Sequence, residues 1–183
     1  MAISSRQRRF LVLSYAVFPA IFNFLMGAAG ARLLFHSHAL VAVKTDFTPG
    51  ADPLNVDGDV FSTAFLLPLI AAWIIAPLAA LAVRHGQVEP MREADSPAFI
   101  RLLAAFSVSA GGALLGVLAM VLYALPVAWT LSAHGISQMP YHDFFWLKAA
   151  NGAALSVIFL PWIGWSSVVR ATEAERQALA RPD

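Results

Sequence analysis

Four long apolar stretches divide this chain, and they constrain its fold more than any other feature. They cover about residues 10–35, 60–83, 102–131 and 144–169. A helix rises 1.5 Å per residue, so each stretch is long enough to cross a hydrocarbon core of roughly 30 Å. Backbone groups in lipid need internal hydrogen bonds, which favours helices over open strands. The sequence therefore predicts an all-α fold, a polytopic membrane protein built as a four-transmembrane-helix bundle.

The composition agrees with this prediction and excludes other classes of protein. The 183 residues are 59% hydrophobic and 13% charged, whereas soluble domains carry roughly 25% charged residues. A chain of this length has room for a single membrane domain, residues 1–183, and for no large additional domain. A net charge of +1 argues against nucleic-acid binding, and the absence of Cys excludes disulfides, Fe–S clusters and thiolate metal sites.

The positions of the basic residues predict the orientation of the spans. Nine of the twelve Lys and Arg residues precede the first span, lie in the inner loop 84–101 or follow the fourth span; they are Arg6, Arg8, Arg9, Arg84, Arg92, Arg101, Arg170, Arg176 and Arg181. Because basic residues near span ends are retained in the cytoplasm, both termini are predicted to be cytoplasmic.

This orientation makes residues 36–59 and 132–143 the outer loops. Residues 171–183 form a cytoplasmic tail, which reads as a polar helix end or a frayed terminus. Together with the small loops, the charge bias predicts a location in a prokaryotic inner membrane.

Small residues recur at helical spacing and predict where the helices pack. Gly112 and Gly116 form a GxxxG motif in the third span, and Gly27 lies on the small face of the first. Such faces let helix backbones approach closely where lipid supplies no hydrophobic drive between helices. Beyond packing the bundle, these glycines are predicted to mediate self-association or contacts with other membrane subunits.

Two amides and a phenol within the apolar stretches are candidate ligand-binding groups. Asn23 belongs to the first span, Tyr123 to the third and Asn151 to the fourth. Counting residues from the span ends puts Tyr123 and Asn151 at a shared depth of roughly 10–12 Å. An unpaired polar group in lipid costs several kcal/mol. These side chains should therefore either bond between helices or line a ligand cavity.

Arg32 and Lys148 lie near the outer ends of the first and fourth spans, among aromatic residues typical of a membrane interface. They are predicted either to anchor the spans or to hold an anionic headgroup or carboxylate. In the second case they would stand at the mouth of a cleft lined by Asn23, Tyr123 and Asn151. No ionisable residue occupies the middle of a span, which argues against proton pumps and bis-histidine haem sites.

Two further patterns on the outer side are weaker. Neutral imidazoles can bind Zn or Cu, and the four outer histidines, whose spacing matches no metal motif, are His36, His38, His134 and His142. Residues 55–59 resemble a calcium loop but lack the carboxylates required at its first and twelfth positions. Asp57 or Asp59 is instead predicted to cap the second helix.

The leading functional hypothesis is a small non-enzymatic membrane protein that self-associates and transports, permeates or binds a neutral or lipid-like small molecule. The first alternative is an accessory subunit of a larger membrane complex, which would use the same small-residue faces for docking. The second is a membrane enzyme with a metal site at the outer histidines. Under the leading hypothesis no cofactor is expected.

Overall fold

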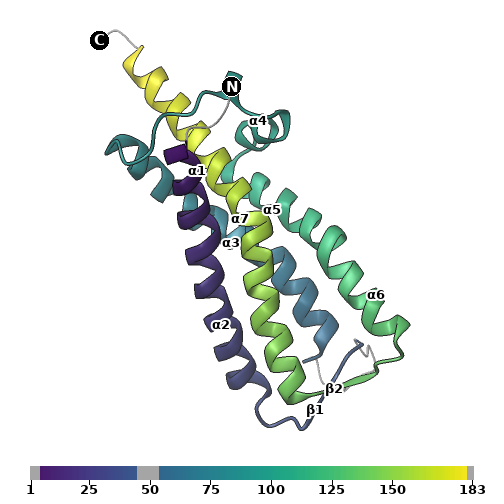
Figure 1. Ribbon diagram of the computed structural model, residues 1–183. Coiled ribbons are helices and arrows are strands. Elements are labelled where there is room, and N and C mark those ends of the chain that lie inside the picture. The colour runs from purple at the N-terminus through teal and green to yellow at the C-terminus, as the bar shows by residue number, and fades with distance from the viewer. Residues whose placement is uncertain (1–4, 45–53, 181–183) are drawn as a thin grey trace.

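The structure is a computed structural model that describes residues 5–44 and 54–180. It confirms the all-α prediction, because four helices are long and apolar enough to cross a membrane. These four spans are Arg9–Phe35, Val56–Arg84, Val108–Ala133 and Tyr141–Leu179. Figure 1 shows them lying along one another, with the start of the first and the end of the last at the same end of the bundle. The four helices indicate an integral membrane protein.

The first span is one continuous helix with a wider turn inside it. Its segments are α1 (Ser5–Val12), the π-helical turn η1 (Leu13–Val17) and α2 (Phe18–Phe35). In the π-turn the Phe18 N–H donates to the carbonyl of Leu13. Pro19, which has no N–H, follows directly. A local π adjustment of this kind keeps the backbone groups around a proline bonded within the membrane.

The third span begins later than the apolar pattern predicted. A separate short helix, α4 (Ala98–Ala105), ends at an extended residue, Phe106, before α5 (Val108–Ala119) begins. Ser107 caps α5, since its hydroxyl accepts a hydrogen bond from the N–H of Ala110 at 3.2 Å. The predicted start at residue 102 is therefore wrong.

The third span repeats the π-turn of the first. After α5 come the π-turn η3 (Met120–Ala124) and α6 (Leu125–Ala133). The N–H of Leu125 donates to the carbonyl of Met120, and Pro126 follows. Both turns contain a tyrosine, Tyr15 in η1 and Tyr123 in η3.

The second span is α3 (Val56–Arg84), and Asn55 caps it. The side-chain oxygen of Asn55 accepts a hydrogen bond from the N–H of Gly58 at 2.7 Å. The prediction of an aspartate cap is wrong, because Asp57 and Asp59 lie within the first helical turn. There they are favourably placed against the helix dipole.

The fourth span is α7 (Tyr141–Leu179), which continues through most of the predicted tail. Residues 171–179 are therefore helical, while residues 181–183, with Arg181, lie outside the described residues. The side chains of Arg6 and Arg8 also lie outside what the structure describes.

The two loops at the end of the bundle away from the chain ends pair as a β-ribbon (Figure 1). Its antiparallel strands are β1 (Leu40–Ala42) and β2 (Gln138–Pro140), with Val41 opposite Met139. Val41 is 1% exposed and Met139 9% exposed, so the ribbon covers the end of the bundle. We call this the ribbon end and the opposite end the basic end. Residues 45–53 of the first loop lie outside the described residues.

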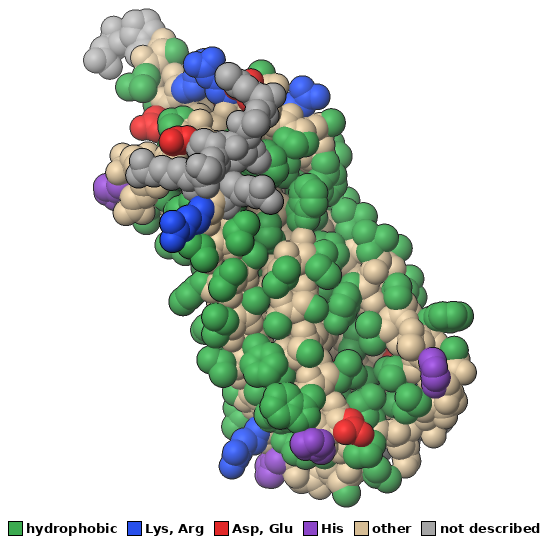
Figure 2. Space-filling view, viewed as in Figure 1, with side chains coloured by type: hydrophobic (Ala, Val, Ile, Leu, Met, Phe, Trp, Pro, Cys, Tyr) green, Lys and Arg blue, Asp and Glu red, His purple; other side chains and the backbone are tan. Residues whose placement is uncertain are grey.

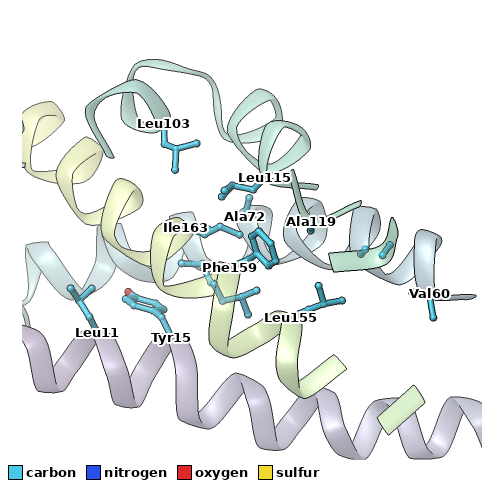
Figure 3. Packing of buried hydrophobic residues seen from close by; sticks show 14 of the residues in the cluster. Leu11, Tyr15, Val60, Ala72, Leu103, Leu115, Ala119, Leu155, Phe159 and Ile163 are labelled. Carbon is cyan, nitrogen blue, oxygen red and sulfur yellow. The ribbon is translucent and has the colours of Figure 1, made fainter. Parts of the chain in front are cut away.

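The last helix is the central one of the bundle. It packs along α2 on one side and α3 on another, and α3 packs in turn against α5. In Figure 3 the core side chains Leu155, Phe159 and Ile163 of α7 lie between α3, α5 and the first span. Consistent with this position, α7 is the most buried of the four spans.

The outer surface between the two ends is apolar. Figure 2 shows hydrophobic side chains along the length of the bundle, with Lys and Arg side chains gathered mainly at the basic end. Large exposed residues include Phe18, Leu25, Ile74 and Trp129, each more than half exposed. An apolar surface of this extent matches contact with lipid.

Candidate functional site

Gly27 and Gly152 lie where the first and fourth spans contact each other, and we call this contact the seam. A Cβ atom on Gly27 would lie 2.8 Å from the carbonyl oxygen of Lys148. One on Gly152 would lie 2.8 Å from the carbonyl oxygen of Asn23. No side chain fits at such distances, so α2 and α7 meet backbone to backbone.

The GxxxG motif makes the same kind of contact between α5 and α3. A Cβ on Gly112 would lie 2.9 Å from the Cβ of Ala72, and one on Gly116 would lie 2.7 Å from the carbonyl oxygen of Phe65. Gly112, Gly116 and Gly27 therefore pack helices of the same chain. Self-association and docking onto other subunits through these glycines remain predictions.

Asn23 bonds between helices. Its Nδ2 donates to the hydroxyl of Ser156 on α7 at 2.9 Å, and that hydroxyl donates to the carbonyl of Gly152 at 2.7 Å. This pair is interhelical hydrogen bonding, one of the two roles predicted for the amide. This hydrogen bond lies at the seam, next to the contact between Gly152 and Asn23.

Lys148 forms an ion pair with Asp59 of α3 near the ribbon end. The two side chains are 12% and 10% exposed, so the pair is almost fully buried. The ammonium group also lies 6.0 Å from the ring centroid of Phe35. Because Asp59 neutralises its charge, Lys148 is not available to bind an anionic ligand. Residue spacing gave no signal for a contact between positions 59 and 148.

Asn151 is not among the residues that line the groove of Tyr123. Asn151 is 1% exposed, and within the described residues neither polar atom of its side chain has a hydrogen-bond partner. Tyr123 lines a groove with Ile158 and Phe159. These two residues lie seven and eight positions beyond Asn151 on α7, or roughly 10–12 Å along the helix.

Arg32 lines an open groove between the end of α2 and the start of α7. The groove has a volume of about 600 Å³, and its lining consists of Arg32, Leu33, His36, Tyr141, His142 and Phe145. Arg32 on α2 and His36, the residue that caps the end of α2, are four positions apart, as Tyr141 and Phe145 are on α7, so the end of one helix faces the start of the other. We call this site the Arg32 groove.

The Arg32 groove combines polar donors with apolar walls. The guanidinium offers five N–H donors in a fixed fork that matches phosphate or carboxylate oxygens. The imidazoles of His36 and His142 add further nitrogen atoms, and Leu33 and Phe145 supply hydrocarbon. Such a combination suits the junction between the polar head and the apolar chain of a lipid-like molecule.

The four outer histidines are not gathered at one point. His36 and His142 line the Arg32 groove, whereas a ring nitrogen of His134 lies 2.8 Å from the carbonyl of Thr130. The ring of His38 contacts that of Phe35. Over residues 5–44 and 54–180, no group of three or more His, Asp or Glu side chains is arranged to hold a metal ion. The metal-site alternative therefore has no assembled ligand set there.

At the basic end, Arg170 has a role that sequence analysis missed. One Nη atom donates to the carbonyls of Leu103 (3.0 Å) and Phe106 (2.9 Å), and Nε donates to that of Ala104 (3.3 Å). Carbonyls at a helix end have no partner within the helix. Arg170 of α7 thus fastens the end of α4 to the bundle, a contact that is visible only in three dimensions.

Comparison of the chain with models of protein families, with curated proteins and with solved structures gives no match.

Proposed function

We propose that this membrane protein binds an amphipathic, lipid-like molecule with an anionic polar end in the Arg32 groove. The observation that carries the proposal is the groove itself, in which one guanidinium and two imidazoles adjoin the apolar side chains of Leu33 and Phe145. The polar end lies against Arg32, and the hydrocarbon part leaves along the exposed apolar surface of α2.

The charges around the groove support an anionic ligand. Arg32 is exposed and has no acidic partner among the described residues. Lys148 is neutralised by Asp59, and Lys44, the third cation near this end, lines a different groove. Arg32 is therefore the cation left to meet a phosphate or carboxylate.

The seam below the groove favours binding over permeation. About one and a half to two and a half turns from Arg32, α2 and α7 meet backbone to backbone at Gly27 and Gly152. A polar head cannot pass between helices in such contact. The groove therefore ends near the membrane surface and holds its ligand there.

The proposed orientation places both termini in the cytoplasm of a prokaryotic cell and the ribbon end outside its inner membrane. The support is the charge bias: Arg84, Arg92, Arg101 and Arg176 belong to the basic end, while Arg32 and Lys148 lie near the ribbon end. The Arg32 groove then meets ligand from the outer leaflet.

Native mass spectrometry of the detergent-solubilised protein tests the proposal. Three probes separate the parts of the ligand: dioleoyl phosphatidic acid has head and chains, dioleoylglycerol has chains alone, and glycerol 3-phosphate has the head alone. Phosphatidic acid is expected to bind in saturable fashion and more tightly than either of the others. Arg32→Gln should weaken it about tenfold, because a charge-assisted hydrogen bond is lost.

The matched control is Arg101→Gln, which removes an exposed guanidinium from α4 at the basic end. It should leave the affinity for phosphatidic acid unchanged. Equal affinity of the wild type and Arg32→Gln, or equal binding of dioleoylglycerol, contradicts the proposal.

A further inference from the structure

A second groove lies on the α5 side of α7, within the length of the spans. Its volume is about 270 Å³, and its lining includes Phe99, Leu118, Leu122, Tyr123, Phe159 and Trp162. Figure 3 shows Leu115 and Phe159, which form its wall toward the core. Leu122 and Ile158 are 65% and 47% exposed, so the groove opens sideways toward lipid. We call it the Tyr123 groove.

The hydroxyl of Tyr123 is the distinctive polar group of this groove. No hydrogen bond between described residues involves this hydroxyl. A tyrosine hydroxyl that is removed from water usually finds a partner, because leaving it unbonded costs free energy. The π-turn η3, which contains Tyr123, is of a kind that occurs frequently at functional sites. A ligand with an acceptor oxygen would satisfy the hydroxyl.

The other lining residues favour a ligand that has an aromatic ring and no charge. Phe99 and Trp162 pack edge to face at 5.4 Å between ring centroids, and Phe159 adds a third ring. Aromatic side chains of this kind favour stacked or edge-on contact with another ring. The groove is lined by no charged side chain among the described residues, so it does not suit an ionic ligand.

We infer that the Tyr123 groove binds a neutral, membrane-soluble molecule with an aromatic ring and a carbonyl oxygen. The carbonyl accepts a hydrogen bond from Tyr123, and the ring lies among Phe99, Phe159 and Trp162. The volume, just below the range of pockets for drug-sized ligands, limits the ring system to about one or two rings. This site is independent of the Arg32 groove, because the two share no lining residue.

Photolabelling with benzophenone tests the inference directly, since this probe has two rings and one carbonyl and inserts into nearby C–H bonds on illumination. The protein is labelled in lipid nanodiscs, and the labelled peptides are mapped by mass spectrometry. Label is expected on Leu115–Tyr123 and Ile158–Trp162. Acetophenone, which has one ring and the carbonyl, should displace the probe. Ethylbenzene, which has the same skeleton without the carbonyl, should do so about fivefold less well, the effect of one neutral hydrogen bond.

Two variants and a control complete the test. Tyr123→Phe removes only the hydroxyl and should weaken labelling of the groove about fivefold, whereas Tyr141→Phe, in the Arg32 groove, should not. Leu118→Trp should fill the Tyr123 groove and abolish its label while the protein keeps its thermal transition. Equal labelling of all four spans, undiminished labelling of Tyr123→Phe, or equal competition by both compounds would show that the groove holds only ordinary lipid chains.

Discussion

Removing one partner of the buried ion pair should destabilise the protein strongly. Asp59→Leu removes the carboxylate and leaves the ammonium of Lys148 without its counter-charge, in a site where the Lys148 side chain is 12% exposed. Lys148→Met leaves the carboxylate of Asp59 unpaired in the same way. One oxygen of that carboxylate already has no hydrogen-bond partner within the described residues.

The expected magnitude follows from the burial of both side chains. An uncompensated charge in such a site costs about 3–5 kcal/mol in the free energy of unfolding. At about 2–4 °C per kcal/mol for a chain of this length, the melting temperature should fall by roughly 6–20 °C. The double variant Asp59→Leu/Lys148→Met removes both charges and should recover most of the loss, since an apolar pair replaces a buried ion pair at little cost.

Thermal unfolding of the four proteins in detergent completes a double-mutant cycle. The control is Arg176→Met, because the Arg176 and Glu173 side chains are 55% and 28% exposed. An exposed pair contributes about 0–1 kcal/mol, so this variant should melt close to the wild type. If the two single variants melt like the control, or if the double variant loses the sum of both effects, Asp59 and Lys148 do not form the pair described.

Three further changes have defined outcomes. Gly116→Ala should lower the melting temperature, because its Cβ would lie 2.7 Å from the carbonyl oxygen of Phe65. Gly111→Ala should raise or keep the melting temperature, because the atom nearest to its Cβ lies at 3.5 Å. The reverse order of the two melting temperatures would contradict the α3–α5 packing. Arg170→Met should speed amide hydrogen exchange in α4, because the end of that helix loses its hydrogen bonds to α7. Unchanged exchange would show that Arg170 does not stabilise α4. Asn151→Leu should keep or raise thermal stability, because the amide has no partner among the described residues. A lower melting temperature for that variant would show that the amide is bonded.

Hydropathy alone was sufficient to predict the four spans, because about 20 consecutive apolar residues have few other stable arrangements. The start of the third span was missed, since residues 102–106 are apolar and continue the pattern in the sequence. Ser107 was the signal available, as serine is a favoured N-cap. Asn55 gave the same signal for α3, because asparagine is also a favoured N-cap. Asp57 and Asp59 were predicted in its place, since aspartate is a favoured N-cap as well.

The candidate site was predictable only in its residue types. The polar residues at the span ends were identified, but their pairing depends on how the helices are ordered around α7. Lys148 pairs with Asp59 because α3 and α7 are neighbours. Arg32 and His142 line one groove because α2 also packs along α7. The β-ribbon escaped prediction because each of its strands has only three residues.

Thiol labelling of intact cells tests the central claim, that the chain spans the membrane with the ribbon end outside and the basic end inside. The chain has no Cys, so the single variants Ser137→Cys and Glu89→Cys each carry one reactive thiol. Both positions are exposed, Ser137 beside β2 at the ribbon end and Glu89 between α3 and α4. A membrane-impermeant maleimide should label Ser137→Cys in intact cells and Glu89→Cys only after the cells are permeabilised. Labelling of Glu89→Cys in intact cells, with Ser137→Cys protected, would contradict the orientation and with it the proposed access of ligand to the Arg32 groove from the outer leaflet.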